Sequence, residues 1–303
     1  MGALTGKVVA VTGSGRGIGR AMALACAAEG ARVLVNDFGG TGSGEGHDDG
    51  PAYDVVKEIR DAGGEAAANT ASVAEPGGAA SVIEDAVKAF GQIDGVVNNA
   101  GFLRDVIFHK MSVVDWESVI NVHLNGSFYV AKAAASYFKE QGSGSYVHFT
   151  STSGLVGNFG QANYSAAKMG VVGLSTSIAL DMQRFGVRSN CVAPFAWSRM
   201  TSSIPTDTPA QQERVERLKQ MTPEKVAPLV VFLLSDAAKE VSGQIFSVRK
   251  NEIYLFNRPV VTRSVHRSDG WDQESLAKEM LPMMQNNFQP LKRSPEVFCW
   301  DPI

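Results

Sequence analysis

The sequence predicts an α/β protein built on a parallel sheet, and three observations support this fold class. The chain has 303 residues, of which 44% are hydrophobic and 31 are glycine, so it can bury one large core. Short apolar runs alternate with stretches of helical periodicity. A glycine-rich string at residues 12–19 joins the first apolar run to the first helical stretch. Such alternation is typical of parallel strands joined by crossover helices.

The elements follow one another in a regular order along the chain. Apolar runs predict strands at residues 8–11, 32–35, 95–97 and 146–149. The 3.6-residue period predicts helices at residues 18–29, 52–62, 77–90, 116–140 and 163–185. The alternation of predicted strands and helices stops near Val248. We therefore predict one domain over residues 1–247 and a C-terminal extension over 248–303, packed on that domain or at a subunit interface.

Two segments depart from this rhythm. Residues 39–51 are rich in glycine and charge, which predicts an exposed loop after the second strand and leaves a functional role open. The extension is interrupted by several prolines, and only residues 275–286 have the pattern of an amphipathic helix. Its sequence leaves three roles open: shaping a substrate pocket, burying a subunit interface, or covering the sheet edge.

Composition and charge exclude several classes of partner. A net charge of −3 and a pI near 6.0 provide no basic face for nucleic acid or anionic lipid, and no run approaches the ~20 apolar residues that span a bilayer. We expect small molecules and other subunits as partners. Cys26, Cys191 and Cys299 are widely spaced and odd in number, which argues against disulfides. With no signal-peptide pattern, a cytoplasmic location is expected.

The glycine-rich string has the context of a dinucleotide site, because it follows a strand and begins a helix. Glycines allow a tight turn and a close approach of the diphosphate, and the helix N-terminus offers free N–H groups and a positive dipole end. The glycine-rich string alone is weak evidence for a dinucleotide site, since glycines also occupy ordinary turns. The residues expected to contact the cofactor here are Gly13, Ser14, Arg16, Gly17, Ile18 and Gly19.

Two further segments strengthen the dinucleotide hypothesis. Asp37 ends the second strand, about 20 residues after the glycines, where a carboxylate can accept the ribose hydroxyls and repel a 2′-phosphate. We therefore favour NAD over NADP, although Arg16 could pair with such a phosphate. Asn99, Ala100 and Gly101 follow the fourth strand at the edge where open α/β sheets bind ligands, and small residues there allow close contact with the cofactor.

Three residues form a candidate catalytic set. Tyr164 and Lys168 are four apart in a predicted helix, which places both side chains on one face, and Ser151 follows the fifth strand. A phenol titrates near 10 in water, so we expect the Lys168 ammonium and a positive nicotinamide ring to lower the pKa of Tyr164. Tyr164 and Lys168 are therefore also expected to contact the cofactor. Ser151 would hold the substrate oxygen beside the phenol during hydride transfer. Each residue alone has a structural explanation, and their combination carries the hypothesis.

Through residues 12–19, 98–101, Ser151, Tyr164 and Lys168, the chain resembles the short-chain dehydrogenase/reductase family over about residues 5–247. The resemblance implies a Rossmann-type, doubly wound, seven-stranded parallel sheet. It also implies a dimer or tetramer formed through the long helices.

A narrower resemblance is carried by residues 35–40, 99–105, 123–128, 157–168 and 198–201. These segments are similar to the (3R)-hydroxyacyl-CoA dehydrogenase branch that includes part of peroxisomal multifunctional enzyme type 2. This implies oxidation of a 3-hydroxyacyl-CoA, either fatty or steroid-derived, by NAD, with residues 195–221 closing over the substrate. The nearest alternatives are an NADPH-dependent 3-oxoacyl reductase and a free hydroxysteroid dehydrogenase. A nucleotide-binding scaffold without turnover is disfavoured by the complete catalytic set.

The chain departs from the wider family pattern at several positions. His123 stands where the family commonly has an asparagine that holds a proton-relay water, and we expect it to hold that water or to pack, not to bind metal. Ala71 replaces an aspartate near the adenine, so Ser72 and Val73 are expected to supply backbone contacts. Pro194 is expected on the nicotinamide side, followed by Phe195 in place of the usual glycine.

Overall fold

A computed structural model describes residues 2–197 and 208–303. Its sheet has the strand order β3-β2-β1-β4-β5-β6-β7-β8. The first seven strands run parallel and the last pair is antiparallel. The strands are β1 (Val8–Thr12), β2 (Arg32–Asn36), β3 (Ala66–Asn69), β4 (Gly95–Asn98), β5 (Gly144–Phe149), β6 (Val187–Phe195), β7 (Ile245–Arg249) and β8 (Glu252–Phe256).

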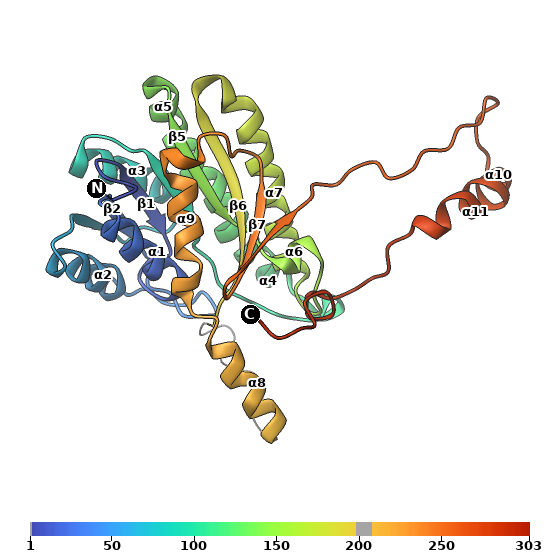
Figure 1. Cartoon of the computed structure of the whole chain (residues 1–303), viewed down its shortest axis with the longest axis horizontal. Helices are drawn as coiled ribbons and strands as arrows, with labels where there is room; N and C mark the ends of the chain where they lie inside the picture. The colour runs from blue at the N-terminus through green and yellow to red at the C-terminus, as the bar shows by residue number, and fades with distance from the viewer. Residues whose placement is uncertain (1, 198–207) are drawn as a thin grey trace.

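Helices cover both faces of the sheet, as Figure 1 shows. One face is covered by α1 (Gly17–Ala28), α2 (Gly50–Asp61) and α9 (Ala227–Leu234). The other is covered by α3 (Pro76–Phe90), α5 (Gly126–Gln141) and α7 (Ala162–Met182). Side chains along a strand point alternately to the two faces of the sheet, so β1 contributes to both cores. Val9 and Val11 pack in the first core, and Val8 and Ala10 pack in the second.

The shorter helices complete the domain. They are α4 (Val113–Ile120), which continues through a π-helical turn at Asn121–Asn125 into α5, α6 (Thr152–Leu155) after β5, and α8 (Pro209–Lys219) before α9. The sequence pattern at 116–140 predicted one uninterrupted helix. The structure has a π-turn within that run, and such insertions often mark functional sites.

The predicted Rossmann-type sheet of seven parallel strands is confirmed, and the extension adds an eighth strand that the sequence did not predict. β8 pairs antiparallel with β7 through residues such as Val248 and Ile253. The extension then contains a helical run over residues 273–287, which includes α10 (Gln273–Ser275) and α11 (Leu281–Met284), and ends with α12 (Ser294–Val297). A helical run thus lies where one amphipathic helix was expected at 275–286, but it is divided by a π-helical turn at Leu276–Met280 and ends in a 3₁₀ turn, and only Ser275 in it is buried.

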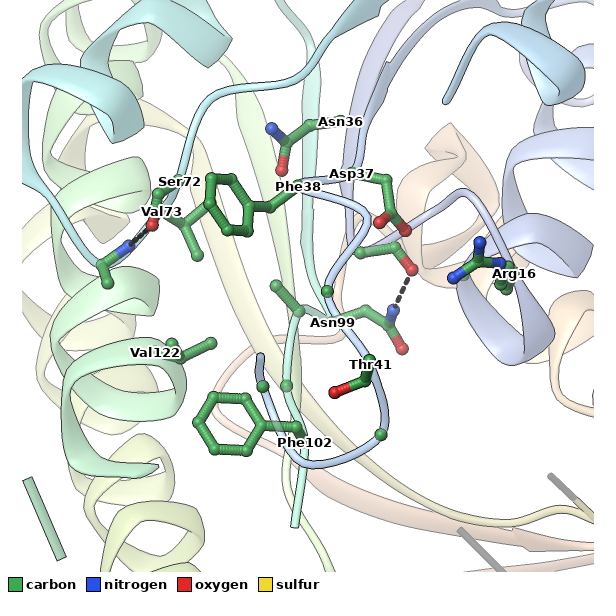
Figure 2. A pocket seen from close by; sticks show the side chains of 18 of the residues that line it. Arg16, Asn36, Asp37, Phe38, Thr41, Ser72, Val73, Asn99, Phe102 and Val122 are labelled. Carbon is green, nitrogen blue, oxygen red and sulfur yellow. Dashed lines mark hydrogen bonds between the residues drawn. The ribbon is translucent and has the colours of Figure 1, made fainter. Parts of the chain in front are cut away.

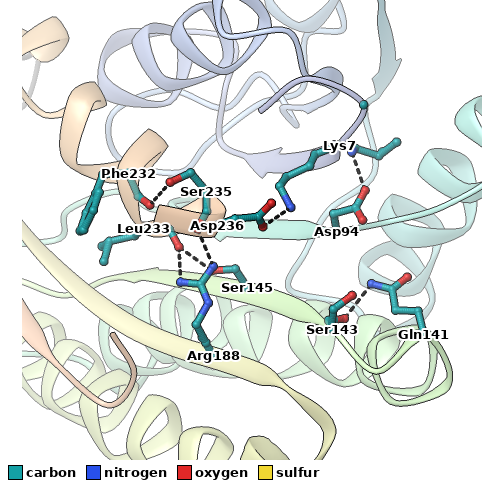
Figure 3. A network of polar contacts seen from close by, with 12 residues as sticks. Lys7, Asp94, Gln141, Ser143, Ser145, Arg188, Phe232, Leu233, Ser235 and Asp236 are labelled. Carbon is teal, nitrogen blue, oxygen red and sulfur yellow. Dashed lines mark hydrogen bonds and ion pairs between the residues drawn. The ribbon is translucent and has the colours of Figure 1, made fainter. Parts of the chain in front are cut away.

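A polar network fixes the edge of the sheet opposite the candidate site (Figure 3). Arg188 on β6 donates to the carbonyl oxygens of Leu233 and Ser235, at 2.6 and 3.1 Å. Lys7 pairs with Asp236 at 2.7 Å. These contacts satisfy the carbonyl groups at the C-terminal end of α9 and join it to the strands. The network leaves the carboxyl ends of the strands free for a ligand site.

Among the described residues, no helix is long and apolar enough to cross a membrane.

Candidate active site

A pocket of about 670 Å³ lies at the carboxyl ends of β1, β2 and β4 (Figure 2). This is the position where the first half of a doubly wound sheet binds nucleotides. Figure 2 shows Arg16 and Asp37 on one side and Val122 and Phe102 on the other. The sequence-predicted cofactor residues that line it are Gly13, Arg16, Gly17, Ile18, Gly19, Asp37, Ser72, Val73, Asn99, Ala100 and Gly101.

The turn between β1 and α1 requires glycine at specific positions. Gly13 and Gly17 have φ values of +63° and +54°, which favour glycine. A Cβ on Gly19 would lie 2.0 Å from the carbonyl oxygen of Gly13. No side chain caps the N-terminus of the 12-residue α1, so its first N–H groups remain available for an anion. The residues present therefore fit the diphosphate of a nicotinamide dinucleotide.

Asp37 and Arg16 decide the chemistry at the ribose end of the pocket. The Asp37 carboxylate accepts hydrogen bonds from the backbone N–H groups of Gly15 and Gly39, both at 2.7 Å. These bonds fix the carboxylate, and each oxygen keeps a lone pair for a further donor. Arg16 is directed to Asp48, at 3.4 Å. The pocket therefore has a fixed anion at its edge, and its nearby cation already has a carboxylate partner.

Asn99 belongs to a hydrogen-bonded junction between the ends of β1 and β4. The Asn99 amide donates to the carbonyl oxygens of Thr12 and Gly13, both at 3.0 Å. The Thr12 hydroxyl accepts from the backbone N–H groups of Asn99 and Ala100. A Cβ on Gly13 would meet the Cα of Ala100 at 2.7 Å. The two chain segments thus approach closely because both have small residues at the contact.

Four predicted cofactor residues are not in the wall of this pocket: Ser14, Tyr164, Lys168 and Pro194. Ser14 is fully buried, and its hydroxyl donates to the carbonyl oxygen of Val11 at 2.7 Å, so its side chain supports the turn from beneath. Pro194 lies on β6 beside Val248 of β7. The contact of Pro194 with a cofactor stays a prediction.

The catalytic set lies next to the pocket, because β5 and α7 meet there. Ser151 lies two residues after the end of β5 and caps α6, where its hydroxyl accepts from the N–H of Ser153 at 3.1 Å. Tyr164 and Lys168 share one face of α7, as their spacing predicted. Thr150 donates to the backbone carbonyl of Lys168 at 2.7 Å and fastens α7 to the end of β5. The structure thus brings the three predicted residues into one site.

Burial governs the titration of Tyr164 and Lys168. It lowers the pKa of Lys168 to about 7, because the ammonium is desolvated. It raises the pKa of Tyr164 to about 12, and the hydrogen bond with Ser151 opposes that rise. The sequence predicted a lowered phenol pKa. In the protein chain alone the pKa of Tyr164 is raised instead, because the desolvation of the phenolate outweighs the effect of the nearby hydrogen-bond donors.

His123 occupies the π-helical turn between α4 and α5 and contacts Tyr164. The two rings meet edge to face, with centroids 5.2 Å apart. Nε2 of His123 lies 2.8 Å from the carbonyl oxygen of Phe102, and Nδ1 is buried without a hydrogen-bond partner. Burial holds the pKa of His123 well below its usual value, so the ring is neutral. Nδ1 is the atom that could bind the expected water; a water there stays a prediction.

The glycine-rich segment predicted as a loop over residues 39–51 is a loop over 39–49, because α2 begins at Gly50. It lines the pocket, a role that the sequence left open. Gly40, Thr41, Gly42 and Gly44 line the pocket. The N–H of Leu103 donates to the carbonyl of Gly42 at 3.2 Å, so the loop is fastened to the segment after β4. The loop is largely exposed as predicted, and it also forms one wall of the pocket. The glycine content of this loop is the sequence feature that could have indicated its place beside the pocket.

Asp105 is a second residue near Tyr164 for which the sequence indicated no role. Its carboxylate accepts a hydrogen bond from the Gln161 side chain at 2.8 Å. Burial raises the pKa of Asp105, and its charge in turn raises that of Tyr164. The residue stood within the 99–105 segment that carried the narrower resemblance, but a single carboxylate in a loop has no distinguishing pattern.

Part of the predicted substrate lid lies outside the described residues. Residues 198–207 fall there, including the 198–201 segment used for the resemblance. Within the predicted lid of 195–221, the structure describes residues 195–197 and 208–221, which include α8. Among the described residues, no group of three or more histidine, cysteine or acidic side chains is placed to hold a metal ion.

Comparisons with known proteins place this site in a family. The family model described as Enoyl-(Acyl carrier protein) reductase matches residues 13–250. The mouse peroxisomal multifunctional enzyme type 2 is 47% identical over 243 residues, which are 80% of this chain and 31% of that protein. This chain thus spans about a third of that relative. Hydroxyacyl-CoA dehydrogenase ChsB1 of Mycobacterium tuberculosis is 38% identical over 287 residues, covering 90% of this chain and 87% of that protein.

A solved structure is similar to this chain in its tertiary fold as well. The crystal structure of a short chain dehydrogenase from Mycobacterium avium matches with a TM-score of 0.83 and 38% sequence identity, covering 96% of this chain and 99% of that one. The predicted resemblance is therefore confirmed. Together with the Ser151, Tyr164 and Lys168 set beside a dinucleotide pocket, these matches show that the chain belongs to the short-chain dehydrogenase/reductase family of nicotinamide-dependent oxidoreductases.

Proposed function

We propose that the protein oxidises (3R)-3-hydroxyacyl-CoA thioesters to 3-oxoacyl-CoA thioesters with NAD. The observation that carries this proposal is the placement of Ser151, which caps α6 just after β5, with Tyr164 and Lys168 of α7 next to a pocket whose edge holds the fixed carboxylate of Asp37. The first feature supports proton transfer at a secondary alcohol, and the second favours a cofactor without a 2′-phosphate.

Each catalytic residue has a distinct task in this reaction. NAD would supply the acceptor for the hydride that leaves the alcohol carbon, and a positive ring near the phenol. Tyr164 takes the proton of the alcohol oxygen as the carbonyl forms. Ser151 donates a hydrogen bond to that oxygen and holds it in place. Lys168 adds positive charge behind the phenol and, with the oxidised ring, offsets the desolvation that disfavours the phenolate.

Support for NAD comes from the charges at the ribose end. The Asp37 carboxylate, held by two backbone donors, would repel a 2′-phosphate. Arg16, the cation that could attract such a phosphate, is directed to Asp48. Both members of that pair are partly exposed, so its strength is modest, and the argument depends mainly on Asp37.

Support for the acyl-CoA substrate comes from the relatives. The similarity to ChsB1, named a hydroxyacyl-CoA dehydrogenase, extends over 90% of this chain. The sequence segments at 99–105 and 157–168 favoured the same branch. The similarity to a 3-oxoacyl-[acyl-carrier-protein] reductase of Synechocystis, 40% identical over 250 residues, keeps the reverse reaction, reduction of a 3-oxoacyl thioester by NADPH, as the second candidate.

A substrate and cofactor screen tests this proposal. Purified protein would be assayed with (3R)- and (3S)-3-hydroxyacyl-CoA of short, long and steroid-derived chains, and with free hydroxysteroids, by absorbance of the reduced nicotinamide. We expect turnover with the (3R) thioesters and NAD, with kcat/KM at least tenfold higher than with NADP. Preference for NADPH and 3-oxoacyl thioesters would establish the reductase instead. Turnover of free hydroxysteroids alone would replace the acyl-CoA assignment. NAD binding without any turnover would indicate a scaffold.

The proposal includes a cytoplasmic location and self-association as a homodimer or homotetramer. Cys26 and Cys191 are buried and free, and Cys299 is exposed and free, which suits a reducing compartment. Cell fractionation tests the location, and recovery of the chain in a membrane-enclosed or secreted fraction would refute it. Light scattering at micromolar concentration tests self-association, and a monomer would refute that part.

A further inference from the structure

Residues 102–106, here called the connector, lie between the glycine-rich loop at 39–49 and the N-terminal end of α7. They follow β4 and have no regular secondary structure. The loop lines the cofactor pocket, and α7 carries Tyr164. The hydrogen bonds of the connector therefore decide whether the part of the site that binds the cofactor and the part that moves the proton are independent.

Toward the loop, the connector donates two hydrogen bonds to backbone carbonyl groups. The N–H of Leu103 donates to the carbonyl oxygen of Gly42 at 3.2 Å. The guanidinium Nε of Arg104 donates to the carbonyl oxygen of Ser43 at 3.1 Å. Gly42 and Gly44, on either side of Ser43, both line the cofactor pocket. Two consecutive residues of the connector thus hold the part of the loop that faces the cofactor.

Toward α7, the same residues bond to the segment that begins the helix. The Asn163 side-chain amide donates to the backbone carbonyl oxygen of Arg104 at 3.1 Å, and the N–H of Val106 donates to that of Gly160 at 2.8 Å. Asn163 is fully buried, and its side-chain oxygen accepts from the N–H of Tyr164 at 2.7 Å. Three hydrogen bonds through Arg104 and Asn163 therefore lead from the loop to the backbone of Tyr164.

The Arg104 side chain is held by the protein on several sides. Besides its bond to the loop, Nη1 donates to the hydroxyl of Ser118 in α4 at 3.2 Å. The guanidinium lies over the Phe102 ring, 5.6 Å from its centroid, and Asp115 lies 4.0 Å from Nη1. A planar fork of donors can make both bonds at once, and a lysine ammonium cannot reproduce that geometry. Arg104 therefore joins the loop, α4 and, through its carbonyl group, α7.

We propose that the connector couples the closure of the glycine-rich loop over the cofactor to the placement of Tyr164, with Arg104 as the positioning residue. Most of the loop is exposed, so a cofactor in the pocket would add the contacts that order it. An ordered loop fixes the Ser43 carbonyl and Arg104, and the Arg104 carbonyl fixes Asn163 beside Tyr164. The inference rests on the cofactor part of the proposed function and not on the acyl-CoA substrate.

Hydrogen exchange tests the coupling without any substrate. In the wild type, saturating NAD should slow amide exchange at residues 160–164 by about tenfold or more. Arg104→Met keeps an aliphatic side chain over Phe102 and loses both side-chain hydrogen bonds, so the effect of saturating NAD should fall below about twofold. A purely structural role would lower protection equally with and without NAD. That result, or a wild type whose exchange does not respond to NAD, would overturn the proposal.

Two further arginine variants separate coupling from charge. Arg16→Met is the matched control, because Arg16 also lines the pocket but pairs with Asp48, outside the connector. With NAD saturating, its NAD-dependent protection at residues 160–164 should equal that of the wild type. Arg104→Lys keeps the charge and loses the fork, so we expect it to resemble Arg104→Met. Full protection in Arg104→Lys would mean that Arg104 acts by its charge alone, and the coupling would be refuted.

Turnover provides a second measurement. With NAD and substrate saturating, Arg104→Met should lower kcat by about tenfold or more, because a misplaced phenol impairs proton transfer. The KM of the alcohol should change by less than about threefold, since the substrate itself is bound elsewhere. An unchanged kcat would overturn the link to Tyr164. If no thioester is turned over by the wild type, the proposed function fails, and the exchange experiment still decides the role of the connector.

Discussion

The ammonium of Lys168 lies 5.6 Å from the centre of the Tyr164 ring. It donates to the carbonyl oxygen of Phe149 at 2.7 Å, so a strand-end carbonyl fixes the cation and the phenol need not do so. The charge can thus favour the phenolate without a direct hydrogen bond to it. Because burial lowers the pKa of Lys168 to about 7 and raises that of Tyr164 to about 12, each group depends on the other, and on a bound cofactor, to reach its working state.

Replacement of Tyr164 by phenylalanine separates proton transfer from cofactor binding. The ring remains and the hydroxyl that exchanges the proton is lost, so we expect kcat to fall by about 10²–10⁴-fold. The dissociation constant of NAD should change by less than about threefold, because the pocket wall itself is unaltered. Stopped-flow turnover and fluorescence titration measure the two quantities. Retention of wild-type kcat would remove Tyr164 from the proton-transfer role.

The buried Lys168 should make stability depend on pH. Its pKa is lowered from 10.5 to about 7 on folding, so between these pH values the unfolded chain binds more protons than the folded chain, and stability rises with pH. At pH 6.5 the cost of the buried ammonium is on the order of 5 kcal/mol, at about 1.4 kcal/mol per pKa unit.

Lys168→Met removes that titration. Without cofactor, the free energy of unfolding of the variant minus that of the wild type should decrease steadily from pH 6.5 to pH 9.5, as measured by urea unfolding. Tyr164, with its pKa raised to about 12, affects stability only above pH 10. A difference that stays constant over this range would contradict the burial argument.

Asp37 should control the choice between NAD and NADP. Asp37→Ser removes the fixed anion and one acceptor for the ribose, and a hydrogen bond to a charged group contributes about 1.5–3 kcal/mol. We expect kcat/KM with NAD to fall by about 10–100-fold and the ratio of NADP to NAD activity to rise. Asp48→Ser is the control, because it frees Arg16 and keeps Asp37. If Asp48→Ser shifts the ratio more than Asp37→Ser, Arg16 and not Asp37 governs selectivity.

The loop at 39–49 should hold the cofactor through the contact between Gly44 and Phe102. Gly44 has φ of +81°, and a Cβ there would lie 2.7 Å from the Phe102 ring. Gly44→Ala should therefore displace the loop and raise the dissociation constant of NAD by about tenfold, or ~1.4 kcal/mol.

Gly46→Ala is the matched control for this contact. Gly46 has φ of +78° and nothing within 4 Å of an added Cβ, so it carries the same backbone strain without the collision. Isothermal titration of both variants with NAD gives the comparison. Equal effects would mean that backbone strain, and not the Phe102 contact, explains the loss.

Local spacing was sufficient to predict much of the site. Four residues make about one helical turn, so Tyr164 and Lys168 had to share a face of α7 once a helix formed there. A strand followed by glycines and a helix placed Gly13 and Gly19 at the nucleotide end. Ser14 shows the limit of such patterns: it stands within the string, yet its hydroxyl turns inward to the carbonyl of Val11.

The sequence by itself determined the parallel sheet, the order of its elements and the residues available for hydride and proton transfer, because periodicity and short motifs depend on near neighbours. The tertiary structure decided which of two opposing effects sets the Tyr164 pKa, because desolvation depends on everything packed around the phenol. It also decided that residues 39–49 would wall the pocket and that the extension would add β8 and project an arm. Those outcomes depend on contacts between segments far apart in the chain, which no local pattern records.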